Sequence, residues 1–237
     1  MSLLGHLRSL SGHQLDTFIA PDLSRLKTCS APEIPNPPNY PNSLHLNNMF
    51  RARYKEAALI SIANAIRRTS FAITNYGAGR QYLLTYVESL PDQKISAYFQ
   101  ALSYFETCIL HTYTAMLLFK EFFRGDEQLE NYFRESTEEM LDFNNAIKHF
   151  DEDINNFKND KNAKPLLNPI WITEDSIECL TRKHKPECGN LPAREKGSKC
   201  SLSFYDLAEK LKNLAEISKI LSTKAPENTL AEQNGLN

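Results

Sequence analysis

The feature that most constrains the fold is a long apolar segment between Pro91 and Arg124. Its large hydrophobic residues recur every three or four positions, which is the spacing of one face of an α-helix. Further apolar residues widen this face, and a helix that is apolar over such an arc packs at the centre of a bundle. The sequence therefore predicts a central helix that ends at Gly125. Its main stripe consists of Ile95, Phe99, Leu102, Phe105, Ile109, Tyr113 and Met116.

The segments on both sides of this helix show the same periodicity. We expect a long helix over residues 47–74, a short one over 80–90, an acidic one over 126–157 and a last one after Ser203, where Ser203 and Asp206 resemble an N-terminal cap. The run 75–79 contains Gly77 and Gly79 and is interpreted as a turn that stops the first helix. The predicted fold is all-α, a bundle of four main helices with short connections.

Three segments depart from this helical pattern. Residues 21–41 hold six of the twelve prolines, so residues 1–46 are expected to form an irregular, proline-rich arm. The bundle domain is placed at 47–224. Within it, residues 158–202 are rich in proline and glycine and are expected to form a long irregular insertion before the last helix. Residues 225–237 carry little apolar material and are expected to be a frayed tail.

Charge is distributed unevenly along the chain. The 27 basic and 29 acidic residues give a net charge of −2, which argues against nucleic-acid binding over most of the surface. Residues 125–157 hold ten acidic and two basic residues, so one helix is strongly acidic. No apolar run reaches the length of a membrane span, and no secretory signal pattern opens the sequence. We expect a soluble cytoplasmic protein with no membrane association.

A polar cluster on the acidic helix is the best candidate for a site. On a helical wheel, Asp142, Asn145, His149 and Glu152 lie opposite the apolar seam, and Asn145 and His149 are neighbours four residues apart. A histidine among carboxylates is favoured in its charged form and can act as a general acid or base. The alternative is an ordinary solvated histidine on a solvated face. His111, in the central helix, is interpreted as a core histidine.

The run Asn-Asn-Ala-Ile-Lys-His-Phe-Asp-Glu at 144–152 resembles the motif helix of the HEPN superfamily (higher eukaryotes and prokaryotes nucleotide-binding domains). The stretch 165–173 also resembles HEPN-like proteins, and the resemblance covers residues 47–224. It implies an all-helical bundle that forms a homodimer and needs no cofactor. Many members are metal-independent endoribonucleases of toxin–antitoxin, CRISPR and phage-defence systems. Their motif is an arginine, a polar residue, three further residues and a histidine.

The resemblance assigns the motif positions to Asn144, Asn145 and His149, with Asn144 where the family has its arginine. In the family, the arginine would steady the scissile phosphate and the histidine would handle the 2′-hydroxyl proton. Asn144 carries no charge and cannot form a bidentate fork to phosphate. RNA binding would then rest on Lys148 beside the motif and on basic groups from elsewhere, such as Arg67 and Arg68. We therefore favour, narrowly, a member that no longer cleaves RNA over an active endoribonuclease.

Two other hypotheses stay open. Thiolates and an imidazole are common zinc ligands, and Cys179, His184, Cys188 and Cys200 fall within the predicted insertion, although their spacing lacks a tight Cys-x2-Cys pair. The alternative is that these cysteines are ordinary reduced thiols. A non-enzymatic interaction module is the rival to the RNA-linked function. Its acidic helix face would bind a basic protein partner, and the same charge would repel RNA.

Overall fold

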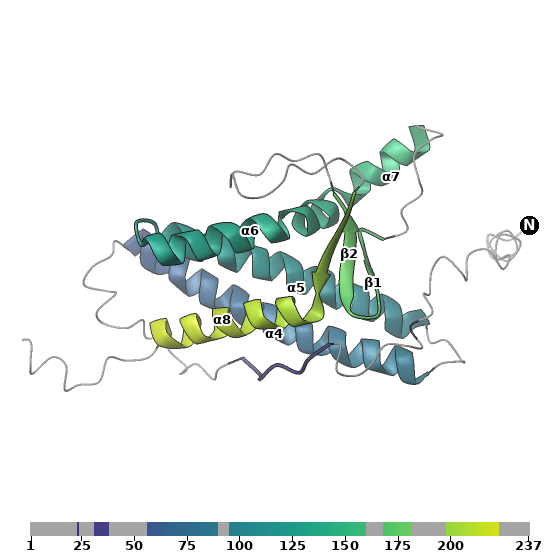
Figure 1. Ribbon diagram of the computed structural model, residues 1–237, viewed down its shortest axis with the longest axis horizontal. Coiled ribbons are helices and arrows are strands. Elements are labelled where there is room, and N and C mark those ends of the chain that lie inside the picture. The colour runs from purple at the N-terminus through teal and green to yellow at the C-terminus, as the bar shows by residue number, and fades with distance from the viewer. Residues whose placement is uncertain are drawn as a thin grey trace, which may run out of the picture.

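The computed structural model describes residues 23, 31–37, 56–89, 95–159, 168–181 and 198–222. Its helices are α4 (Glu56–Glu88), α5 (Ile95–Phe122), α6 (Glu127–Lys148), α7 (Phe150–Asn159) and α8 (Phe204–Ser222). Three short strands, β1 (Ile170–Ile172), β2 (Ser176–Leu180) and β3 (Lys199–Ser203), come between α7 and α8. The predicted all-α class is confirmed, with a small sheet added to it (Figure 1).

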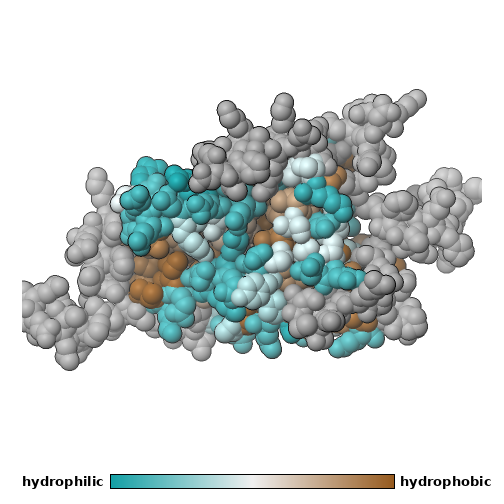
Figure 2. Space-filling view, in the orientation of Figure 1, coloured by the Kyte–Doolittle hydropathy of each residue, from teal (hydrophilic) through white to brown (hydrophobic). Residues whose placement is uncertain are grey.

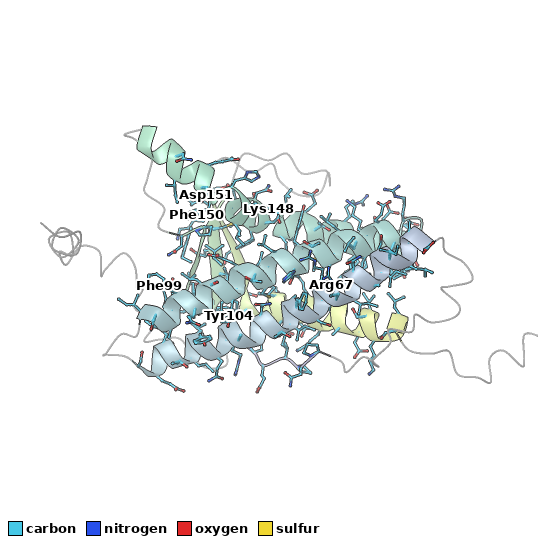
Figure 3. The ribbon with its side chains drawn as sticks, turned by 180° about the vertical axis from the view of Figure 1, so that it is seen from behind. Arg67, Phe99, Tyr104, Lys148, Phe150 and Asp151 are labelled. Atoms are coloured by element: carbon cyan, nitrogen blue, oxygen red, sulfur yellow. The ribbon has the colours of Figure 1, made fainter. Side chains whose placement is uncertain are left out.

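Helix α5 is the centre of the bundle, as its apolar stripe predicted. It contacts α4 along most of its length and also packs against α6, α8 and β1 (Figure 1). Phe105, Ile109 and Met116 are fully buried. Phe99 is the exception in the predicted stripe, because 43% of it is exposed. It lies near the N-terminal end of α5 (Figure 3).

Helix α4 runs without a break through the segment that was predicted to stop it. Gly77 and Gly79 both lie within α4, so the two expected helices at 47–74 and 80–90 are one helix from Glu56 onward. Gly79 is buried, and a Cβ there would lie 3.2 Å from ring atoms of Phe105. The glycine therefore permits close approach of α4 and α5 rather than a turn.

Helix α6 begins and ends where local sequence dictates. Gly125 has a φ of 95°, and the Asp126 side chain then accepts a hydrogen bond from the Leu129 backbone N–H at 3.2 Å. The predicted single helix over 126–157 is wrong, because the chain leaves helical geometry at His149 and restarts as α7. Acidic residues Glu127 and Glu130 occupy the first turn, where the helix dipole favours negative charge.

The segment 158–202 is not wholly irregular as predicted. Its described part forms an antiparallel sheet in the order β1-β2-β3. Alternate residues, including Ile172, Ile177 and Leu202, are buried, and β1 and β2 contact α5 and α6. Trp171 and Glu178 are opposite one another on the other face, where the Trp171 indole N–H donates to Glu178 Oε2 at 2.7 Å. The sheet thus alternates apolar and polar faces, as a sheet covered on one side must.

The last helix follows β3 directly. The Ser203 hydroxyl oxygen accepts from the Asp206 backbone N–H at 2.9 Å, and its O–H donates to Asp206 Oδ2 at 2.6 Å. This confirms the predicted cap at the start of α8. Its apolar stripe, which includes Leu207, Leu211 and Leu214, is buried. The predicted tail at 225–237 lies outside the described residues.

Residues 31–37 have no helix or strand, which agrees with the predicted irregular arm. They dock on α4 through backbone oxygens. Tyr76 donates its hydroxyl to the Pro32 carbonyl at 2.8 Å, and Arg80 Nε donates to the Ala31 carbonyl at 2.7 Å. Ala31 and Leu23 are buried, so this part of the arm belongs to the packed structure.

Two surface properties bear on function. The surface of α6 is hydrophilic over much of the face seen in Figure 2. None of the helices in the described ranges is both long enough and apolar enough to span a bilayer.

Candidate functional site

The predicted motif histidine lies at the junction between α6 and α7. His149 is the C-terminal cap of α6, and its backbone N–H donates to the Asn145 carbonyl at 3.1 Å. Its side chain is 42% exposed, and its Nδ1 lies 3.1 Å from Glu152 Oε1. The predicted acidic neighbour of His149 is therefore confirmed. A carboxylate at this distance can accept a hydrogen bond from Nδ1–H and so hold the imidazole in one orientation.

Neither asparagine of the motif is exposed, although Asn145 was predicted to lie on a solvated face with His149. Asn145 is half-buried, and its Oδ1 accepts from Asn144 Nδ2 at 3.4 Å. Its link to His149 is through the backbone, since no side-chain hydrogen bond joins the two in the described structure. Asn144, at the position that the family resemblance gives to arginine, is only 3% exposed. Its Oδ1 is buried with no hydrogen-bond partner among the described residues.

The polar face of α6 is less solvated than the helical wheel predicted. Asp142 is 1% exposed and Glu138, one turn before it, is 8% exposed. Helix α6 contacts β1 and β2 as well as α5, so it packs against the sheet in addition to the bundle. The wheel placed Asp142 correctly on its helix, but it carried no information about the sheet.

The predicted RNA-binding residues do not gather around His149. Lys148 is exposed, and its Nζ lies 6.0 Å from the centre of the Tyr113 ring. Arg67 and Arg68 lie on α4, and α5 lies between α4 and α6 (Figure 3). Their side chains contact residues of α4 and α5. The structure thus separates the basic group of α4 from the motif.

A histidine that the sequence analysis assigned to the core is the partner of Arg68. Arg68 Nη1 lies 2.9 Å from His111 Nδ1. Partial burial, Arg68 and Arg67 all lower the pKa of His111. The His111 ring is 5.4 Å from that of Phe71, which is 44% exposed. The interpretation of His111 as a core residue is wrong: it lies half-buried at the outer edge of the α4–α5 interface.

Sequence reasoning missed this contact because 43 residues separate Arg68 from His111. Helical periodicity placed each residue on its own helix. It did not give the relative register of α4 and α5. The one available signal is that α4 carries Arg67, Arg68 and Arg80 between its terminal glutamates and no other charge.

A polar cleft lies between α6, β3 and α8. It has a volume of about 390 Å³ and carries three carboxylates, Glu139, Asp206 and Glu209, with one lysine, Lys210. Lys210 Nζ is 2.6 Å from Glu139 Oε2, which links α8 to α6. On the same surface Asn213 Nδ2 donates to the Tyr132 hydroxyl at 3.2 Å. The cleft brings the predicted acidic face of α6 next to acidic residues at the start of α8. The charge distribution along the sequence did not predict that these residues are neighbours.

The structure brings together two of the four predicted metal ligands. Cys179 of β2 and Cys200 of β3 are directly opposite in the sheet, and both are buried as thiols. His184 and Cys188 lie outside the described residues. Within the described ranges, no group of three or more histidine, cysteine or acidic side chains is arranged to hold a metal ion. The four-ligand zinc site stays a prediction.

Comparisons with known proteins add no relative. No family model matches the chain, and neither the curated proteins nor the solved structures contain a match.

Proposed function

We propose that the chain is a HEPN-like helical protein that binds a partner and does not cleave RNA. The observation that carries this is the environment of Asn144. The residue at the arginine position is uncharged, buried and hydrogen-bonded to its neighbour Asn145. A phosphate cannot reach a side chain with so little exposure, and an amide would give it no charge.

The electrostatics around His149 support the same conclusion. Its nearest charged side chain on α7 is Glu152, a carboxylate that would repel an approaching phosphate. Arg67 and Arg68 could have replaced the missing arginine, but Arg68 bonds to His111 of α5 and Arg67 to Asn64 of α4. A carboxylate-oriented histidine remains, and by itself it is not enough to hold an RNA backbone in a reactive position.

An RNA cleavage assay tests the proposal directly. Purified wild type and His149→Ala are incubated with a mixed RNA pool in EDTA and the products are separated by electrophoresis. We expect no cleavage by either protein at high protein concentration. Cleavage by wild type that disappears in His149→Ala would overturn the proposal and establish a metal-independent endoribonuclease that works without the motif arginine.

The polar cleft between α6, β3 and α8, called the acidic cleft below, favours a basic protein as the partner. Its three carboxylates outnumber its single lysine; Glu139 is paired with Lys210 and Glu209 with Lys212, which leaves Asp206 without a basic partner among the described residues. Lysine or arginine side chains of a partner would find complementary charge there, while RNA would be repelled. The expected homodimer and cytoplasmic location accompany this proposal, and sedimentation of the purified chain measures the oligomeric state.

A binding assay with a lysine- and arginine-rich peptide tests this partner class. We expect saturable binding that weakens with salt and falls by about tenfold in the double variant Glu139→Gln, Glu209→Gln. The matched control is Glu127→Gln, Glu216→Gln, which removes the same charge outside the cleft. Equal weakening in both variants would show attraction by net charge alone and would contradict a role for the cleft.

A further inference from the structure

The outer edge of the α4–α5 interface is unusual in its charge. Between its terminal residues Glu56 and Glu88, α4 carries three arginines and no acid. Arg80 is bonded to the arm through the Ala31 carbonyl. Arg67 and Arg68 therefore remain as two adjacent positive charges on a helix that offers no compensating carboxylate near them.

The facing helix does not neutralise them either. The acids of α5 are Glu106 and Glu121. Glu106 and His111 are five positions apart, so the two side chains point about 140° apart around the helix axis. The charged groups that act on His111 are the two arginines alone. Both guanidinium groups thus lie near one imidazole, and no carboxylate contacts them among the described residues.

Neutral groups hold both arginines in place. Arg67 Nη2 donates to Asn64 Oδ1 at 3.1 Å, and its guanidinium lies 5.9 Å from the centre of the Phe71 ring. Arg68 Nη1 donates to His111 Nδ1 at 2.9 Å. His111 therefore accepts at Nδ1 and carries its proton at Nε2, where it is a further hydrogen-bond donor. The cluster presents two oriented positive charges and an imidazole N–H, and it contains no anion.

We propose that Arg67, Arg68 and His111 form a binding site for a phosphate group. Guanidinium groups match the oxygens of phosphate in geometry and charge, and an imidazole N–H adds a third donor. Figure 3 shows the position of Arg67 on the α4–α5 pair. The half-exposed ring of Phe71 lies beside the arginines, so a nucleotide could bring a base into contact with it. The site is independent of the motif at His149 and of the acidic cleft.

Calorimetric titration of the full chain with inorganic phosphate, adenosine 5′-monophosphate and adenosine tests the site. We expect saturable binding of both phosphate-bearing ligands and none of adenosine. Equal affinities would identify the phosphate group as the whole ligand, and tighter binding of the nucleotide would add the Phe71 contact. Either result supports the site.

Matched variants locate the binding. Arg68→Gln should weaken binding by about tenfold to a hundredfold, the loss expected for one charge-assisted contact. Arg68→Lys, which keeps the charge but loses the fork, should lie between Arg68→Gln and wild type. Arg124→Gln is the control, because Arg124 is an exposed arginine already paired with Glu121. Thermal unfolding of each variant shows that it is folded.

Three results would overturn the proposal. They are the absence of saturable binding by either phosphate-bearing ligand, equal binding by wild type and Arg68→Gln, and binding of adenosine as tight as that of its monophosphate. A direct readout on the site is the imidazole nitrogen spectrum of His111. It should shift as phosphate is added to wild type, and folded Arg68→Gln should need about tenfold to a hundredfold more phosphate for the same shift.

Discussion

Gly79 of α4 lies against the ring of Phe105 of α5, and a Cβ at this position would be 3.2 to 3.3 Å from three atoms of that ring. Phe105 is fully buried and held between Tyr76 and Phe204, at ring-centre distances of 5.9 and 5.4 Å. The ring therefore has little room to move. We expect Gly79→Ala to lower the free energy of unfolding by about 1–3 kcal/mol, as overpacking in a core does, measured by urea unfolding.

Gly77 is the matched control, because it lies in the same helix and nothing comes within 4 Å of a Cβ placed there. Alanine is favoured over glycine in helices by about 1 kcal/mol, so Gly77→Ala should raise the free energy of unfolding by up to that amount. If both substitutions stabilise the protein, the contact between Gly79 and Phe105 does not restrict the packing of α4 on α5.

This glycine pair also shows what the sequence could and could not predict about the fold. The apolar spacing of α5 and α8 is a local property, and both helices were predicted correctly. The glycines of α4 were interpreted as a stop because a local pattern cannot show that Gly79 faces Phe105, 26 positions later in the chain. The three-stranded sheet was missed for a similar reason. Its strands are only three to five residues long, and β2 and β3 are far apart in sequence.

The candidate sites show the same limit: a contact between residues close in sequence was predicted, and contacts between distant elements were not. His149 and Glu152 are only three positions apart, so the sequence predicted their contact correctly even though the helix breaks at His149. The burial of Asn144 and Asp142 depends on packing against other elements, and the contact between Arg68 and His111 depends on the register of two helices. No local pattern carries that information.

The burial of Asn144 leads to a prediction about the missing arginine. We expect Asn144→Arg to lower the free energy of unfolding by about 3 kcal/mol or more, because it would place an uncompensated charge in a buried position. Asn144→Leu should be neutral or stabilise by about 1 kcal/mol, since it removes a buried carbonyl that lacks a partner among the described residues. Urea unfolding of both variants is the measurement. An arginine variant as stable as wild type would mean that this position can reach solvent, and it would reopen the question of RNA cleavage.

The lowered pKa of His111 predicts how stability depends on pH. Burial, Arg68 and Arg67 hold this pKa below its ordinary value of 6.5. As the pH falls below 6.5, the unfolded chain takes up a proton before the folded chain does, so stability is lost in this range and is full above it. His111→Gln should reduce the loss of stability between about pH 7 and pH 5. Unfolding at about pH 8, where His111 is neutral in both states, gives the effect of the substitution itself. An unchanged slope in the variant would show that His111 is not the group responsible.

Glu106 predicts a dependence on pH of the opposite sign. Burial raises the pKa of this carboxyl from 4.5 to about 7. As the pH rises from 4.5 to about 7, the unfolded chain loses its proton before the folded chain does. Its contribution to stability is therefore full below pH 4.5 and falls through this range.

Glutamine keeps the shape of the neutral acid and cannot ionise. Glu106→Gln should therefore be more stable than wild type at about pH 8 and close to wild type at about pH 4. Glu121→Gln is the control, because Glu121 is an exposed glutamate on the same helix. Urea unfolding at several pH values measures both variants. Parallel curves for wild type and Glu106→Gln would show that Glu106 ionises equally readily in the folded and unfolded chains.

Because the His111 and Glu106 effects oppose each other near pH 6, the stability of the wild type should depend only weakly on pH there. The double variant His111→Gln, Glu106→Gln removes both contributions, so its remaining slope measures the other titrating groups.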